Sequence, residues 1–216
     1  MFLLFCLFDL LILFFLSRLI TRALSRLIHT KTRKLSHTVT VFSFLLLPGT
    51  FLHELAHYVS AHILGVKTFE FVLLPKLEGE SVRLGSVSME KSDIVRRAII
   101  GVAPLLIGLG GIFFCFWLIS TQPAYVFWQV ALAVIFTFQI SNTMFPSKAD
   151  MKGSAPLFVL VVCLIIAVFF LAKGSMGEVY RFGSEAFFKT ALYYLSVVIA
   201  IDIVFFTVLR ILLQRR

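Results

Sequence analysis

The sequence is short of charged residues. Asp, Glu, Lys and Arg together make up 14% of its 216 residues, whereas hydrophobic residues make up 60% and the mean hydropathy is +1.00. A water-soluble domain of this length needs far less apolar surface, so the composition excludes that class. Several apolar runs approach the ~20 residues that cross a hydrocarbon core about 30 Å thick. The chain is therefore predicted to be a multi-pass integral membrane protein.

Cysteine is scarce as well. The three cysteines, Cys6, Cys115 and Cys163, each lie in an apolar run and form no C-x-x-C pair. This excludes a disulfide framework and a cysteine-based zinc site. An internal repeat is also absent from the sequence, so an inverted-repeat transporter is not supported. The first apolar run has no basic segment before it and no A-x-A site, which favours an uncleaved span over a signal peptide.

The charge that is present is mostly positive, with a net value of +9. Lys and Arg sit at the ends of apolar runs, where they anchor helices and contact anionic lipid headgroups. We therefore expect membrane lipids as partners and no nucleic acid. Arg18, Arg22 and Arg26 recur every four residues, which indicates a basic amphipathic helix that continues the first span or lies on the membrane surface.

The apolar runs predict an all-α polytopic fold in one domain, residues 1–216. The six expected spans are residues 2–20, 39–64, 94–120, 124–145, 155–172 and 190–213. Between the second and third spans, residues 66–90 are too polar to cross a membrane and show strand-like alternation. They predict a small membrane-associated β-hairpin or sheet.

The second span carries the pattern His53-Glu54-x-x-His57. Four residues turn an α-helix through about 400°, so the two imidazoles lie on one face and can reach one ion. Glu54 lies about 100° away, close enough to act on water as a general base without ligating the metal. Zn²⁺ is the expected ion, because imidazoles plus a carboxylate and an open position describe a catalytic zinc site. Ionisable groups in an apolar span are costly, which favours a functional site over chance.

A third ligand has to come from another part of the chain. His62 is nine residues after His53 and points to the opposite face, so a structural or interfacial role is expected for it. Carboxylates near span ends are the alternatives: Asp9, Glu70, Asp93, Asp150 and Asp202. Asp150 is favoured, because Asn142 and Pro146 before it break a helix and let its carboxylate turn inward. Asp9 is expected to reach the interface or to pair with another helix.

These stretches resemble the site-2 protease family of intramembrane metalloproteases. Its pattern is H-E-x-x-H on one span and N-x-x-P-x-x-x-x-D-G on a later one. Here Asn142 and Asp150 keep the eight-residue separation, while the proline is displaced by one position to Pro146 and Met151 replaces the glycine. Gly101-Val-Ala-Pro104 is similar to a G-x-x-P-like stretch of the family. The resemblance covers about residues 40–155.

The resemblance implies that His53, His57 and Asp150 hold Zn²⁺ and that Glu54 activates water. It also implies that Asn142 holds the substrate backbone or the oxyanion. The function expected is an intramembrane endopeptidase that cleaves transmembrane protein substrates. A CAAX-type membrane metalloprotease, with a glutamate as third ligand, and a non-proteolytic binding or assembly protein are the alternatives. The oligomeric state stays open.

Overall fold

A computed structural model describes residues 2–73, 76–78, 81–83, 86–121, 126–147, 149–152, 159, 163 and 178–214. Six helices are described in it: α1 (Phe2–Thr32), α2 (Leu35–Leu45), α3 (Leu47–Ile63), α4 (Ile94–Ser120), α5 (Phe127–Thr143) and α7 (Glu178–Gln214). Three of these are long and apolar enough to cross a membrane, namely α1, α4 and residues 185–214 of α7, and the bent pair α2–α3 adds a fourth if it counts as one span. The protein is thus a multi-pass integral membrane protein.

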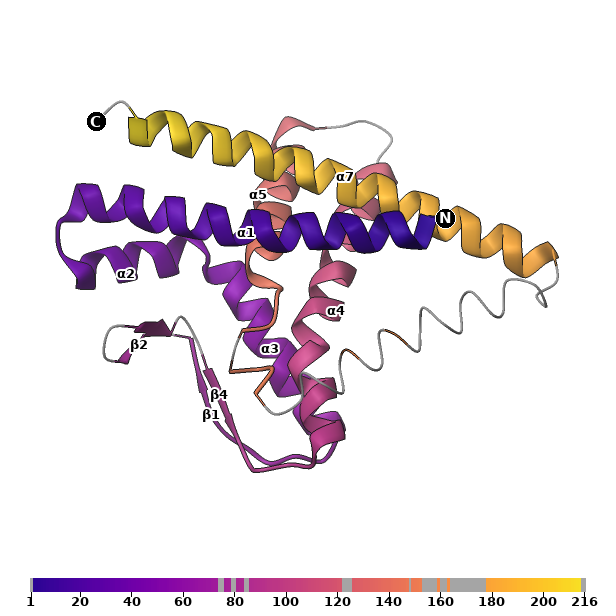
Figure 1. The fold of residues 1–216 in the computed structure, drawn as a ribbon, viewed down its shortest axis with the longest axis horizontal. Coiled ribbons are helices and arrows are strands. Elements are labelled where there is room, and N and C mark those ends of the chain that lie inside the picture. The colour runs from indigo at the N-terminus through magenta and orange to yellow at the C-terminus, as the bar shows by residue number, and fades with distance from the viewer. Residues whose placement is uncertain are drawn as a thin grey trace.

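Helices α1 and α7 lie side by side and form one layer, while α3, α4 and α5 cross beneath it (Figure 1). The two long helices run in the same direction. The Cys6 thiol donates to the Phe188 carbonyl at 3.5 Å, and Ser196 donates to the Asp9 carboxylate at 3.2 Å. The basic segment after residue 18 thus continues the first helix, and Asp9 pairs with another helix, one of the two roles expected for it.

This parallel direction bears on the number of spans. Two spans that run the same way are separated by an odd number of membrane crossings. The expectation of six spans places four crossings between the first and the last, and so does not fit α1 and α7 as a parallel pair of spans. The fourth expected span corresponds to α5, which has 17 residues, and the fifth, residues 155–172, lies almost wholly outside the described residues.

The second expected span is broken. Helices α2 and α3 meet at Leu46 with a bend of 75°. Pro48 lies in the first turn of α3, where its missing N–H costs nothing, but its ring does not allow the hydrogen-bond ladder of α2 to continue. The Leu45 carbonyl at the break accepts a hydrogen bond from the Gln139 amide of α5 at 3.0 Å. The break therefore sets α3 at a steep angle to the layer above.

The β-hairpin predicted for residues 66–90 is present as two nested antiparallel ladders. Strand β1 (Thr68–Val72) pairs with β4 (Ser86–Met89), and β2 (Lys76–Glu78) pairs with β3 (Ser81–Arg83). Phe71 on β1 packs edge-on against Phe51 and Tyr58 of α3, with ring centroids 6.3 and 5.9 Å apart. The hairpin is thereby held along the helix that carries the histidine motif (Figure 1).

The core lies where four helices meet. Its buried members are Cys6 and Leu13 of α1, Ile112 of α4, Ile140 of α5, Met144, and Ala191, Leu195 and Val198 of α7. Many large apolar side chains on the outer faces stay exposed. An outer surface of this kind suits contact with lipid chains, which are as apolar as the side chains they touch.

Candidate metal centre

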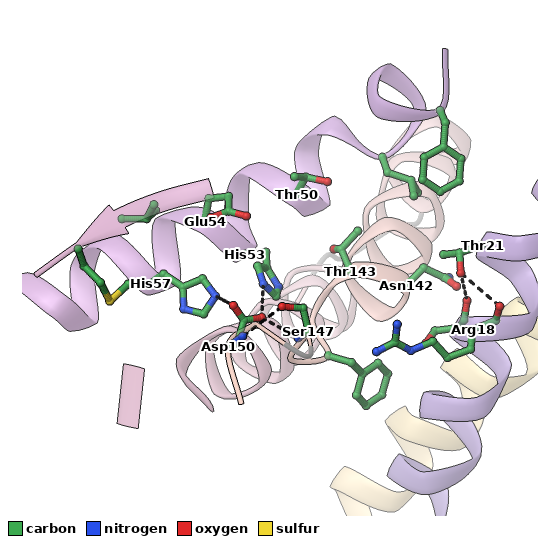
Figure 2. Close-up of a pocket in the computed structure, with 16 residues that line it drawn as sticks. Arg18, Thr21, Thr50, His53, Glu54, His57, Asn142, Thr143, Ser147 and Asp150 are labelled. Carbon is green, nitrogen blue, oxygen red and sulfur yellow. Dashed lines mark hydrogen bonds and ion pairs between the residues drawn. The ribbon is translucent and has the colours of Figure 1, made fainter. Parts of the chain in front are cut away.

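His53, Glu54 and His57 all project from the middle of α3. Glu54 and His57 are buried, with 7% and 5% of their surface exposed. The two imidazoles point toward Asp150 (Figure 2). The motif thus lies on a helix, and its two histidines share a face.

Asp150 reaches the histidines from the segment that follows α5. The helix ends at Thr143, and Pro146 lies a few residues beyond it. The Asp150 carboxylate lies 3.6 Å from His53 Nε2 through Oδ2 and 3.3 Å from His57 Nε2 through Oδ1. One ligand atom from each of the three residues falls within 4.8 Å of the others. The structure therefore brings together the three residues predicted to hold a metal.

A local turn fixes the Asp150 side chain. The Ser147 N–H donates to Asp150 Oδ2 at 2.6 Å, and the Asp150 N–H donates to Ser147 Oγ at 3.2 Å. Such reciprocal bonds stabilise a turn in which a serine precedes an aspartate by three residues. Ser147 escaped the sequence interpretation, although the S-x-x-D spacing could have indicated it.

His57 is oriented from its other side. Its Nδ1 lies 2.9 Å from the Ile100 carbonyl oxygen of α4, and a carbonyl only accepts, so Nδ1 carries the proton. In a neutral imidazole the lone pair is then on Nε2, which faces the Asp150 carboxylate. His57 Nε2 is buried and makes no hydrogen bond within the described part of the chain. Two acceptors 3.3 Å apart require a positive group at this point, either a proton on Nε2 or a cation that both atoms ligate.

The spacing of these atoms suits a cation such as Zn²⁺. Two ligands, each about 2.0–2.1 Å from a tetrahedral zinc ion, are about 3.4 Å from one another. The 3.3 and 3.6 Å separations of Asp150 from the two histidines are close to that value. A metal-binding histidine usually donates its other ring N–H to an outer partner such as a backbone carbonyl, and His57 does so to Ile100. The residues present therefore fit a zinc ion.

The other carboxylates considered as third ligand lie elsewhere. Asp9 accepts from Ser196, Glu70 is exposed on β1, and Asp202 is hydrogen-bonded to α5. Asp93 caps the N-terminus of α4, and the N–H groups of Arg96 and Val95 hold the pKa of its carboxyl below the usual range. His62 is exposed and stacks on Tyr58, outside the cluster, as expected.

A cavity of about 360 Å³ opens beside the cluster. Its walls come from α1, α2, α3, α5, β4 and the segment after α5, and Glu54 and Asn142 both line it. Arg18 of α1 contributes a cation to the far wall, and Val87 and Met89 contribute an apolar edge from the hairpin. The arrangement places the buried Glu54, the cluster of His53, His57 and Asp150, and strand β4 around one space.

Asn142 lies at the end of α5 and is 8% exposed. Its amide nitrogen donates to Asp202 Oδ1 of α7 at 3.1 Å. This contact escaped the sequence interpretation, because nothing in the local pattern relates positions 60 residues apart.

No protein-family model, curated protein or solved structure matches this chain.

Proposed function

We propose that this protein is a zinc-dependent intramembrane endopeptidase that resembles the site-2 proteases. The observation that carries the proposal is the cluster of His53, His57 and Asp150 beside the buried Glu54, inside a chain that crosses the membrane several times. Neutral imidazoles and one carboxylate form a typical catalytic zinc set. The carboxylate in the cluster is an aspartate, whereas Glu70 and Glu90 are exposed, which favours this class over a CAAX-type enzyme.

The chain's own residues have distinct parts in the hydrolysis. A bound Zn²⁺ supplies Lewis acidity, which polarises a peptide carbonyl and eases the loss of a proton from water. Glu54 takes that proton as the water oxygen attacks the carbonyl carbon, and delivers it to the leaving nitrogen as the C–N bond breaks. The Ile100 carbonyl holds His57 in the tautomer that leaves Nε2 free, and Ser147 holds Asp150.

The cavity also suggests how the substrate is held. A peptide bond in a regular helix has its N–H and C=O groups engaged, so the helix has to unwind locally before it is cut. Strand β4 forms one edge of the cavity, and an extended segment can add to such an edge by main-chain hydrogen bonds. A transmembrane segment with a locally extended stretch is the substrate class that this arrangement suits.

Metal analysis together with one cleavage assay tests the proposal. The wild-type protein, Glu54→Gln, Asp150→Ala and the control Asp93→Ala are purified in detergent, and zinc is measured per chain. Cleavage of dye-labelled casein, an unfolded chain of many sequences, is followed in parallel. We expect one zinc per chain in all but Asp150→Ala. Cleavage is expected in the wild type and in Asp93→Ala only.

Each alternative gives a different pattern. Zinc in Asp150→Ala at the wild-type level would show that Asp150 is not the third ligand. Zinc without any difference in cleavage between the wild type and Glu54→Gln, on casein and on membrane proteins compared by their new N-termini, would rule out the endopeptidase. That second result would leave a non-proteolytic membrane protein.

A further inference from the structure

The side-chain amide of Asn142 is hydrogen-bonded through its nitrogen and not through its oxygen within the described residues. Its Nδ2 donates to the Phe138 carbonyl at 2.8 Å and to Asp202 Oδ1 at 3.1 Å. A third acceptor, Ser141 Oγ, lies 3.2 Å from the same nitrogen. Its carbonyl oxygen, Oδ1, is buried and has no hydrogen-bond partner among the residues that the structure describes. Asn142 also lines the cavity beside the histidine–aspartate cluster. One side of the amide is therefore saturated and the other is unpaired.

These hydrogen-bond partners identify which atom of the amide is the nitrogen and which is the oxygen. An amide nitrogen carries two protons, and the Phe138 carbonyl and the Asp202 carboxylate each provide an acceptor for one of them. A flipped amide would set Oδ1 against the Phe138 carbonyl, which has no proton to give. Both protons of Asn142 are thus committed inside the protein, and what remains for a ligand is an acceptor.

Asp202 is a buried carboxyl group on α7. It is fully buried, at 0% exposure, in the apolar part of the helix. A carboxyl group in such a place needs partners. Ser141 of α5, also fully buried, donates to its two oxygens at 3.2 and 3.1 Å, and Asn142 donates to Oδ1. Within the described residues, the hydrogen bonds of the Asp202 carboxyl group come from Ser141 and Asn142, so this group holds the Asn142 side chain.

We propose that Asp202 and Ser141 are positioning residues that hold the Asn142 amide, so that its carbonyl oxygen accepts a backbone N–H of the bound substrate. The inference rests on the proposed function for the identity of the ligand. It also decides between the two roles expected for Asn142. Stabilising an oxyanion requires a donor, and Asn142 has none left, so it holds the substrate backbone.

The sequence makes this testable by a single signal, because Asn142 is the only asparagine in the chain. Incorporation of asparagine labelled with ¹⁵N at the side-chain amide and ¹³C at the side-chain carbonyl gives one NH₂ group and one carbonyl resonance. In the wild type we expect both amide protons to be hydrogen-bonded and slow to exchange. Asp202→Leu removes one acceptor, so its exchange is expected to be at least about tenfold faster.

Ser196→Ala is the matched control. Ser196 also lies on α7 and also bonds a carboxylate, that of Asp9, but it touches neither Asn142 nor Asp202 through any described hydrogen bond. Its variant should leave the Asn142 signal unchanged. An Asn142 signal that is the same in Asp202→Leu as in the wild type would overturn the positioning role, because a folded variant still reports on the amide.

The acceptor role is read by a titration in the Glu54→Gln background, where binding is observed without cleavage. The probes are N-acetyl-leucyl-leucine methylamide and its analogue methylated at every amide nitrogen. We expect the first to shift the ¹³C carbonyl resonance of Asn142 and the second to leave it in place. No shift with the first probe, equal shifts with both, or a response of the NH₂ group alone would overturn the inference. No turnover is measured in this titration. If the protein binds the probe but fails the cleavage assay, the endopeptidase proposal is overturned and the acceptor role of Asn142 still stands.

Discussion

The backbone carbonyl oxygen of Asp150 lies against Gly101 of α4. A Cβ atom at position 101 would be 2.6 Å from that oxygen, a separation that real structures essentially never show. Gly101 follows Ile100, whose carbonyl holds His57. Two consecutive residues of α4 therefore support two of the three residues of the cluster, one through a hydrogen bond and the other by having no side chain.

Gly101→Ala should weaken metal binding. The new methyl group meets backbone atoms, so the Asp150 segment has to move away from the histidines. Outer-shell changes of this kind cost metal sites about 10–100-fold in affinity, and we expect a loss in that range in competition with a chromophoric zinc chelator. Gly110→Ala on the same helix is the control, since a Cβ there meets no atom of the described residues within 4 Å. Equal zinc affinity in the two variants would contradict the packing argument.

Ser147→Ala removes the hydroxyl that accepts from the Asp150 N–H, while the backbone N–H that donates to its carboxylate remains. The turn that presents the carboxylate then keeps one of its two hydrogen bonds, so we expect roughly a tenfold weaker zinc affinity. Ser120→Ala, at the far end of α4, loses only a bond to its own helix and serves as the control. The chelator titration would count against this role of Ser147 if both serine variants bound zinc like the wild type.

Phe71→Ala should affect substrate handling but not the metal. The ring packs on Phe51 and Tyr58, and its loss frees the hairpin from α3. We expect unchanged zinc content and about a tenfold lower kcat/KM on casein, because aromatic contacts of this kind contribute about 0.5–1.5 kcal/mol beyond their buried area. Phe69 lies on the same strand and is 69% exposed, so Phe69→Ala should behave like the wild type. A lower zinc content in Phe71→Ala would mean that the hairpin shapes the metal site itself.

Asp202→Asn and Asp202→Leu should differ in activity. The asparagine variant still offers an oxygen to the Asn142 amide, whereas the leucine variant does not. We expect kcat/KM on casein to stay within about threefold of the wild type in Asp202→Asn and to fall about tenfold or more in Asp202→Leu, the cost of one lost oriented hydrogen bond. Similar losses in both variants would indicate that the charge at position 202, not the acceptor, is what matters.

Much of the architecture could be predicted from local sequence. The apolar runs predicted a multi-pass membrane protein, and α4 occupies the residues expected for the third span. The alternation in residues 66–90 predicted the hairpin. Spacing alone placed His53 and His57 on one face. These features depend on residues a few positions apart, for which periodicity and backbone sterics are sufficient.

The tertiary structure decided the relationships between distant segments. The approach of Asp150 to the histidines, the contact of Ile100 with His57 and the pairing of Asn142 with Asp202 join residues on different elements. The parallel direction of α1 and α7 does not fit the four crossings that the six-span prediction places between them. The sequence by itself determined the membrane class, the helix that carries the motif and the types of ligand available, because composition and helical period are local properties. The sequence favoured Asp150 among several carboxylates, but only packing decided which carboxylate faces the histidines and which one holds Asn142. That choice depends on how closely distant segments approach one another, and the missing side chain at Gly101 leaves room for the Asp150 backbone.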